Sequence, residues 1–119
     1  MLEAAALLLL LLGVAHAYLG ERYLLMRLAR REDSLPRLLG SSAFTLGTLR
    51  FVWHLIALPW GAMAWLLWLA AQGEVSRLAL LQAIGIALLA SALLPLLFTR
   101  GRHLSWVVFL LAGTLVLGA

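Results

Sequence analysis

Four ionisable residues lie within, or at the edge of, long apolar stretches of this sequence: His16, Glu21, Arg50 and His54. Ionisable side chains are costly inside a membrane, so residues of this kind are the first candidates for a functional site. At about 1.5 Å per helical residue, His16 and Arg50 lie at similar depths below the membrane boundary at which the first predicted helix leaves and the second enters. His54 lies one helical turn deeper. If the two helices run antiparallel side by side, we expect the four side chains to converge in one half of the membrane.

Such a group of side chains is open to three chemical uses. Neutral imidazoles with a carboxylate ligate transition metals, and His16 and His54 would be the ligands. Two histidines on facing helices can instead be the axial ligands of a haem. A chain of histidine and glutamate beside an arginine can relay protons or bind an anionic substrate. The sequence holds no HExxH motif and no paired carboxylates within the apolar stretches, so it does not choose among a metal, a haem and a small ligand.

A purely structural role is the alternative. Arg50 is close enough to the interface to extend its charge into the headgroups, and His54 can form a hydrogen bond with a neighbouring helix. Such interhelical bonds contribute only about 0.6 kcal/mol each on average. The chain would then be a non-catalytic accessory or oligomer-forming membrane subunit. We predict no enzyme in either case, because no nucleophile, general acid and base, and oxyanion site can be assembled from these residues.

The amino-acid composition indicates that this chain is surrounded by lipid and not by water. Of the 119 residues, 65% are hydrophobic and 12% are charged, and the mean hydropathy is +1.05. Soluble domains average about 45–50% apolar and about 25% charged residues, so a soluble domain is excluded. The absence of cysteine excludes disulfides and thiolate metal sites, and the absence of lysine excludes Schiff-base chemistry.

The spacing of the charges predicts four membrane spans in a single domain. Unbroken runs of alanine and leucine favour helices over barrel strands, and Pro59 predicts a kink. We therefore predict an all-α, polytopic transmembrane, up-and-down four-helix bundle. Its spans are expected at about residues 2–19, 46–72, 78–98 and 103–119. Although Ala15-His16-Ala17 resembles a signal-peptide cleavage site, Glu3 without a basic neighbour favours a retained span.

Small residues and tryptophans give two further expectations about packing. Ala79, Ala83, Ala87 and Ser91 are four residues apart on one face, so another helix can approach them closely. Trp65 and Trp68 are expected at the outer interface, while Trp60 lies deeper and is expected to pack against a neighbouring helix.

The arginines predict the orientation. Eight of the nine lie on one side of the predicted membrane, and only Arg77 lies on the other. By the positive-inside rule the basic loops face the cytoplasm and both termini face outward. We read residues 21–45 as a basic amphipathic cytoplasmic segment, in which the first helix continues until near Asp33 and Ser41 is among the candidate caps of the second. The partners expected are the lipid bilayer and a second copy or another membrane protein. Nucleic acid is not expected, because topology alone explains the arginines.

Two segments carry a resemblance to other proteins. The segments are HAYLGERYLL at residues 16–25 and TLRFVWH at residues 48–54. They resemble a group of small, functionally uncharacterised bacterial four-helix integral membrane proteins, and the likeness covers about the first half of the chain. The resemblance implies a bacterial inner-membrane location and directs attention to one set of residues, and it implies no activity. That set is His16, Glu21, Arg22, Arg50, Trp53 and His54.

Overall fold

The computed structural model describes all residues from Met1 to Ala119, and its regular elements are all helical, as predicted. The first long helix consists of α1, a π-helical turn η1 and a short α2. A 3₁₀ turn, η2, lies in the following loop, and α3 and α4 form the second long helix. The bounds are Leu2–Leu19 for α1, Gly20–Leu25 for η1, Met26–Ala29 for α2, Glu32–Ser34 for η2, Ser42–Leu55 for α3, Ala57–Gln72 for α4, Arg77–Phe98 for α5 and Ser105–Leu117 for α6.

Three helical runs are long and apolar enough to cross a membrane, namely residues 2–29, 42–72 and 77–98. They contain or closely match the first three predicted spans. The fourth prediction was too long, because α6 has 13 residues instead of the 17 expected. Its length of roughly 20 Å falls short of a hydrocarbon core of about 30 Å. The helix starts late because Arg100 and Gly101 both have positive φ, which forms a turn that α6 cannot include.

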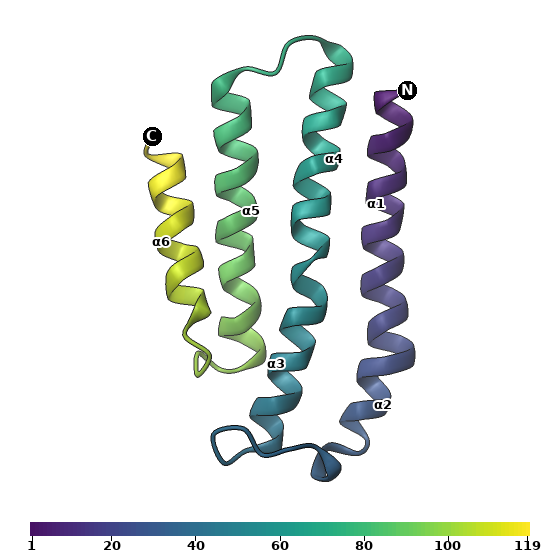
Figure 1. Ribbon diagram of the computed structural model, residues 1–119, viewed down its shortest axis with the longest axis vertical. Helices are drawn as coiled ribbons and strands as arrows, with labels where there is room; N and C mark the ends of the chain where they lie inside the picture. The colour runs from purple at the N-terminus through teal and green to yellow at the C-terminus, as the bar shows by residue number, and fades with distance from the viewer.

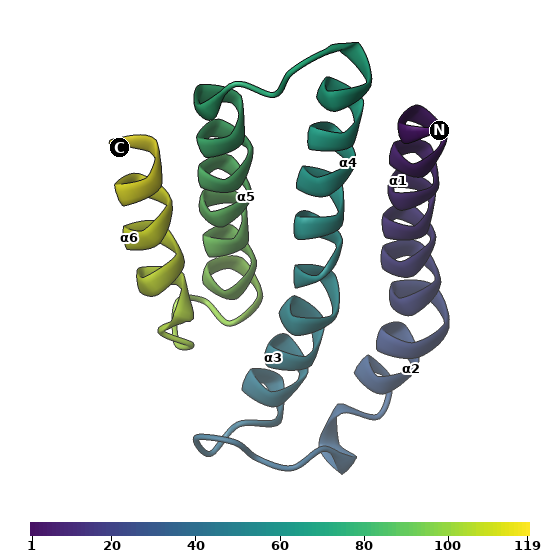
Figure 2. The ribbon, with the colours of Figure 1, turned by 45° about the horizontal axis from the view of Figure 1, so that its top comes forward.

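The helices lie side by side in one curved layer, in the order α6, α5, α4, α1 (Figure 1, Figure 2). The Cα atoms span 52 × 31 × 14 Å, so the molecule is one helix thick. Consecutive long helices run in opposite directions, but α1 and α6 stand at opposite edges of the layer (Figure 1). A single chain therefore does not close the bundle expected from the sequence. In lipid no hydrophobic force gathers apolar helices around an axis, so contacts depend on local packing.

Few residues are buried in this layer. Only 17 of 119 residues are buried, and most leucines of α1, α5 and α6 are exposed, which fits a protein whose solvent is lipid. The helices touch through small residues. Ala6 and Ala64 are buried where α1 meets α4, and Ala83 and Ser91 of the predicted stripe are buried in α5.

Helices α5 and α6 approach each other closely at two glycines. A Cβ added to Gly113 would lie 2.7 Å from the side chain of Leu89 and 3.1 Å from the carbonyl oxygen of Gly85. A Cβ added to Gly85 would lie 2.5 Å from the side chain of Leu117. The short α6 is thus held to the layer by backbones that only glycine allows to approach so closely.

The second long helix is interrupted at Ile56, between α3 and α4. Pro59 explains the break, because proline has no N–H to donate and its ring clashes with the carbonyl one turn earlier. The next backbone bond, from Trp60 N to the Ile56 oxygen, is stretched to 3.5 Å. The kink predicted from Pro59 is confirmed, and the axis of α3 is inclined to that of α4 (Figure 1).

The ends of the helices agree in part with the sequence predictions. Ser41 caps α3, where its hydroxyl oxygen accepts a hydrogen bond from Phe44 N at 3.1 Å. The first long helix ends at Ala29, four residues before the predicted stop near Asp33, and η2 covers the difference.

We predict that Gly113→Val destabilises the chain by about 1–3 kcal/mol, since the added side chain overlaps Leu89 and the Gly85 backbone. Unfolding in mixed detergent micelles measures the change. Gly61→Val is the matched control, because nothing lies within 4 Å of a Cβ added at Gly61. Equal unfolding midpoints for the two variants would contradict the proposed contact between α5 and α6.

Candidate functional site

The carboxylate of Glu21 is shared by two side chains from α3. Arg50 Nη2 donates to Glu21 Oε1, and His54 Nε2 donates to Glu21 Oε2 at 3.0 Å. Each carboxylate oxygen therefore has one cationic or proton-bearing partner. The side chains of Glu21, Arg50 and His54 are 32%, 28% and 17% exposed, so all three are partly buried.

Two helices position this group. Arg50 and His54 are four residues apart, one helical turn, and so lie on the same face of α3. Glu21 is the second residue of η1, whose backbone N–H groups bond five residues back. A π turn holds one residue more than an α turn, and such turns occur frequently at functional sites. The turn directly after Gly20 thus presents the carboxylate to α3.

His16 lies beside this group but does not contact Glu21. Its Nε2 donates to the backbone oxygen of Trp53 at 3.0 Å, and Trp53 Nε1 donates to the backbone oxygen of His16 at the same distance. The two rings are stacked, with centroids 4.5 Å apart and planes 4° from parallel. Trp60 packs edge-on against the imidazole at 5.4 Å, which confirms the packing role predicted for it. These contacts clamp α1 to α3.

Gly20 permits the close contact between His16 and Trp53. It lies four residues after His16, on the same face of the first long helix. A Cβ at this position would overlap the indole of Trp53, so the indole rests directly on the Gly20 backbone. The next residue is Glu21, and the close approach therefore also brings the carboxylate to Arg50 and His54.

The predicted cluster is thus divided. Glu21, Arg50 and His54 meet, whereas His16 is linked to them only through Trp53, the residue before His54. The Nε2 atoms of the predicted metal pair, His16 and His54, have different partners, namely the Trp53 backbone oxygen and the Glu21 carboxylate. No group of three or more His, Asp or Glu side chains is arranged to hold a metal ion.

The third histidine has its own surroundings. His103 packs edge-on against Phe51 at 4.8 Å, and its Nδ1 lies 2.8 Å from the hydroxyl of Ser105. His54, in contrast, stacks on Phe98 at the end of α5, with centroids 5.9 Å apart. Sequence reasoning missed Phe98 and Gly20. For Gly20 a signal was present, since a glycine stands one turn after His16 and directly before Glu21.

Arg50 keeps an unused donor. Its Nε atom is buried and has no hydrogen-bond partner. Unsatisfied buried donors are rare in proteins and require an explanation. An oxygen of a bound anion would supply the missing acceptor.

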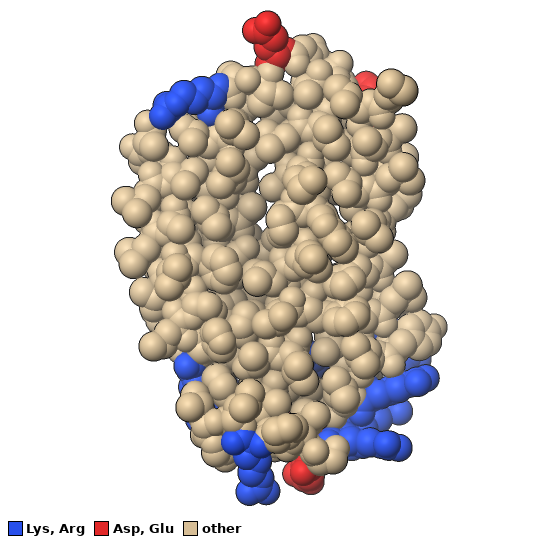
Figure 3. All heavy atoms as spheres, in the orientation of Figure 1, with Lys and Arg blue, Asp and Glu red and all other residues tan.

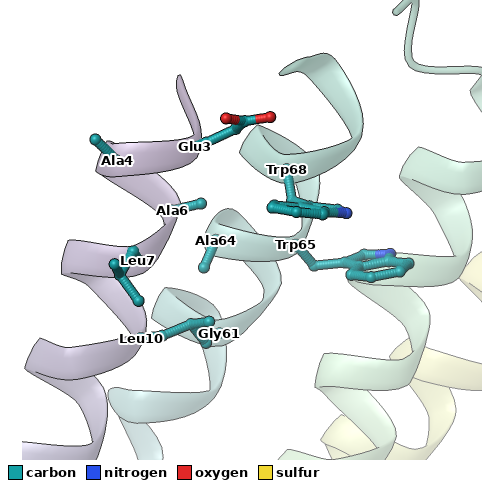
Figure 4. Close-up of a pocket in the computed structure, with 9 residues that line it drawn as sticks. All are labelled: Glu3, Ala4, Ala6, Leu7, Leu10, Gly61, Ala64, Trp65 and Trp68. Carbon is teal, nitrogen blue, oxygen red and sulfur yellow. The ribbon is translucent and has the colours of Figure 1, made fainter. Parts of the chain in front are cut away.

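A cavity also lies at the other end of the molecule, between α1 and α4 (Figure 4). It measures about 610 Å³, and seven of its nine lining residues are hydrophobic. Glu3 is its only ionisable residue, and the Glu3 carboxylate accepts a hydrogen bond from Gln72 Nε2 at 3.2 Å. Trp65 and Trp68 line it and are about half exposed, as expected of side chains at an interface. Its apolar lining and its place at the other end of the molecule put it outside the candidate site.

No protein-family model, curated protein or solved structure matches this chain. Function is therefore inferred from the contacts of Glu21, Arg50 and His54 and their neighbours.

We predict that Gly20→Ala destabilises the chain by about 1–3 kcal/mol, because the methyl group displaces Trp53 and breaks both of its bonds to His16. Detergent unfolding measures the loss, and near-ultraviolet circular dichroism reports the freed indole. Gly13→Ala is the control in the same helix, since its Cβ would meet Ala57 at an ordinary 3.8 Å. Wild-type stability and spectrum in Gly20→Ala would refute the clamp.

Proposed function

We propose that this chain is a small integral membrane protein that binds a small anionic ligand, with exchange of a proton, at Glu21, Arg50 and His54. The shared carboxylate is the observation that carries the proposal. Arg50 and His54 bond to Glu21 within helical runs that are apolar enough to cross a membrane. Ionisable groups at such positions are costly, and they usually mark a binding or proton-transfer site.

The roles of the three side chains follow from their chemistry. Arg50 supplies the positive charge and the free Nε donor for an anion. Glu21 holds the guanidinium in place in the absence of a ligand. His54, which is bonded to the Glu21 carboxylate, is the side chain that we propose to exchange a proton when the anion binds. Uptake of one proton balances the charge of a singly charged anion.

The second candidate is a non-catalytic accessory or oligomer-forming subunit. Two observations favour it. The clamp of His16, Trp53 and Trp60 packs helices without needing a ligand, and the one-layer arrangement leaves both faces open to a second copy or another membrane protein. A closed helical bundle would then form between chains. The metal and haem hypotheses have less support, because the Nε2 atoms of His16 and His54 already have separate partners.

We further propose that the arginine-rich end faces the cytoplasm and both termini face outward. Most cationic side chains gather at one end of the molecule (Figure 3). This asymmetry is the one that the positive-inside rule uses to orient membrane proteins. We also propose that the chain lies in the bacterial inner membrane, on the basis of the resemblance carried by residues 16–25 and 48–54.

We predict that a small anion raises the thermal unfolding midpoint of the purified chain in uncharged detergent. The panel contains phosphate, sulfate, acetate, zinc, nickel and haemin at constant ionic strength. His54→Gln and Arg50→Gln should each weaken the apparent affinity for the anion by about tenfold or more, the effect of losing a charged hydrogen bond.

The other outcomes separate the hypotheses. Stabilisation by zinc or haemin that disappears in His16→Ala and His54→Ala would favour the metal or haem hypothesis instead. No stabilisation by any member of the panel would remove the ligand proposal. If His54→Gln then also changes the oligomer size measured by light scattering, the accessory-subunit hypothesis is supported.

The absence of cysteine permits a direct test of orientation. We predict that Ser34→Cys, in the first loop, is labelled by a membrane-impermeant maleimide only after bacterial cells are opened. Glu74→Cys, in the exposed turn between α4 and α5, should be labelled in intact cells. The reverse pattern would show that the arginine-rich end faces outward.

A further inference from the structure

A cleft of about 410 Å³ opens between the start of α3 and the turn that follows α5. Its walls include three arginines, Arg50, Arg100 and Arg102, and one carboxylate, that of Glu32. The arginines come from two segments that are about fifty residues apart in the sequence, so only the fold brings them together. Arg50 is also the cationic member of the Glu21 group, and the cleft therefore leads into the candidate site.

Arg102 is held in place on the wall of this cleft. Its Nη2 donates to the backbone oxygen of Leu39 at 3.1 Å, and its guanidinium carbon lies 5.1 Å from the centre of the Phe44 ring. Arginine stacks favourably on aromatic faces while its remaining N–H groups stay free for a ligand. The contact therefore fixes the direction of the guanidinium without using all of its donors.

The turn that carries Arg100 is also tied down. Arg100 has φ +52°, in a left-handed region that non-glycine residues rarely adopt. Trp106 Nε1 donates to the Gly101 oxygen at 3.1 Å, and His103 N donates to the Thr99 hydroxyl oxygen at 3.0 Å. These two bonds hold the turn from both sides, so Arg100 and Arg102 remain at the rim of the cleft.

The charge and the donor geometry define the class of ligand. Three guanidinium groups face one carboxylate, and the Nε of Arg50 is buried without a partner. Guanidinium groups offer planar pairs of donors that match the oxygens of a phosphate group. The hydroxyl of Ser41 borders the same cleft, and it can donate to a ligand because its oxygen only accepts a bond, from Phe44 N.

We propose that this cleft binds a phosphate group through Arg50, Arg100 and Arg102. The inference rests on the proposed function, because Arg50 belongs to both sites, and it specifies the anion. The phosphate reaches the cleft either as a free ion from the water or as the headgroup of a lipid, since the cleft lies at the arginine-rich end of the spanning helices. The chemistry of recognition is the same in both cases.

The test uses the full chain in uncharged detergent and two probes. Equilibrium dialysis measures binding of inorganic phosphate, and native mass spectrometry measures retention of phosphatidic acid against diacylglycerol, which lacks the phosphate. The variant Arg100→Gln/Arg102→Gln removes two charges from the cleft. Its matched control, Arg31→Gln/Arg37→Gln, removes two charges from exposed residues of the first loop, at the same end of the chain.

We expect the cleft variant to weaken binding by about tenfold or more and the control variant by less than about twofold. Binding of inorganic phosphate identifies a free ion as the ligand, and binding of phosphatidic acid alone identifies a lipid. The proposal is overturned if neither probe binds, if both double variants weaken binding equally, or if diacylglycerol is retained as well as phosphatidic acid. Should the cleft variant misfold, Arg100→Gln alone replaces it, since the Arg100 side chain is exposed.

Two further variants separate this inference from the proposed function. If Glu21→Gln and His54→Gln weaken phosphate binding while the cleft variant does not, the cleft is rejected and the Glu21 site stands. If only the cleft variant weakens binding, the cleft stands and the Glu21 site loses its role in binding this anion.

Discussion

The contact of Trp53 with Gly20 is the constraint on which the polar site depends. The indole lies on the bare backbone of Gly20 and exchanges two hydrogen bonds with His16, one in each direction. Stacking and paired hydrogen bonds together allow only one register between the first and second long helices. In that register the next residue, Glu21, meets Arg50 and His54. A shift of one residue would turn the carboxylate away from α3, since each residue rotates the helix by about 100°.

Because the long helices are apolar enough to cross a membrane, a few polar and small residues have a large influence on how they pack. Leucine side chains gain nothing by leaving lipid for each other, so an apolar helix has no strong preference for one neighbour. The glycines at the contact of α5 and α6, and the alanines at the contact of α1 and α4, permit close packing along narrow seams. Each helix therefore contacts its neighbours only along narrow lines of small residues, and the helices form a layer one helix thick. Only at the arginine-rich end does α3 meet both η1 and the end of α5, and Glu21, Arg50 and His54 lie there.

The charges of this end form two connected zones. Arg100 and Arg102 lie exposed at the rim of a cleft, while Arg50 extends inward and pairs with Glu21. His54 stands on the inner side, between Glu21 and the ring of Phe98. The positive charge thus continues from the surface to a titratable pair within the helices. This continuity connects the proposed ligand with the proposed proton exchange.

The sequence by itself determined the helical class, the first three spans, the break before Pro59, the cap at Ser41 and the spacing that puts Arg50 and His54 on one face of α3. These features depend on residue periodicity, local hydrogen bonding and the length of apolar runs, all of which can be read along the chain. Only the tertiary structure decided the rest: the single layer, the short α6, the engagement of His16 by Trp53, and the cleft that combines Arg50 with Arg100 and Arg102. Which atoms a side chain meets depends on the register and tilt of neighbouring helices. That register is set by the fit of the Trp53 indole to Gly20, and although the sequence marks the glycine, it does not show which side chain of another helix will meet it.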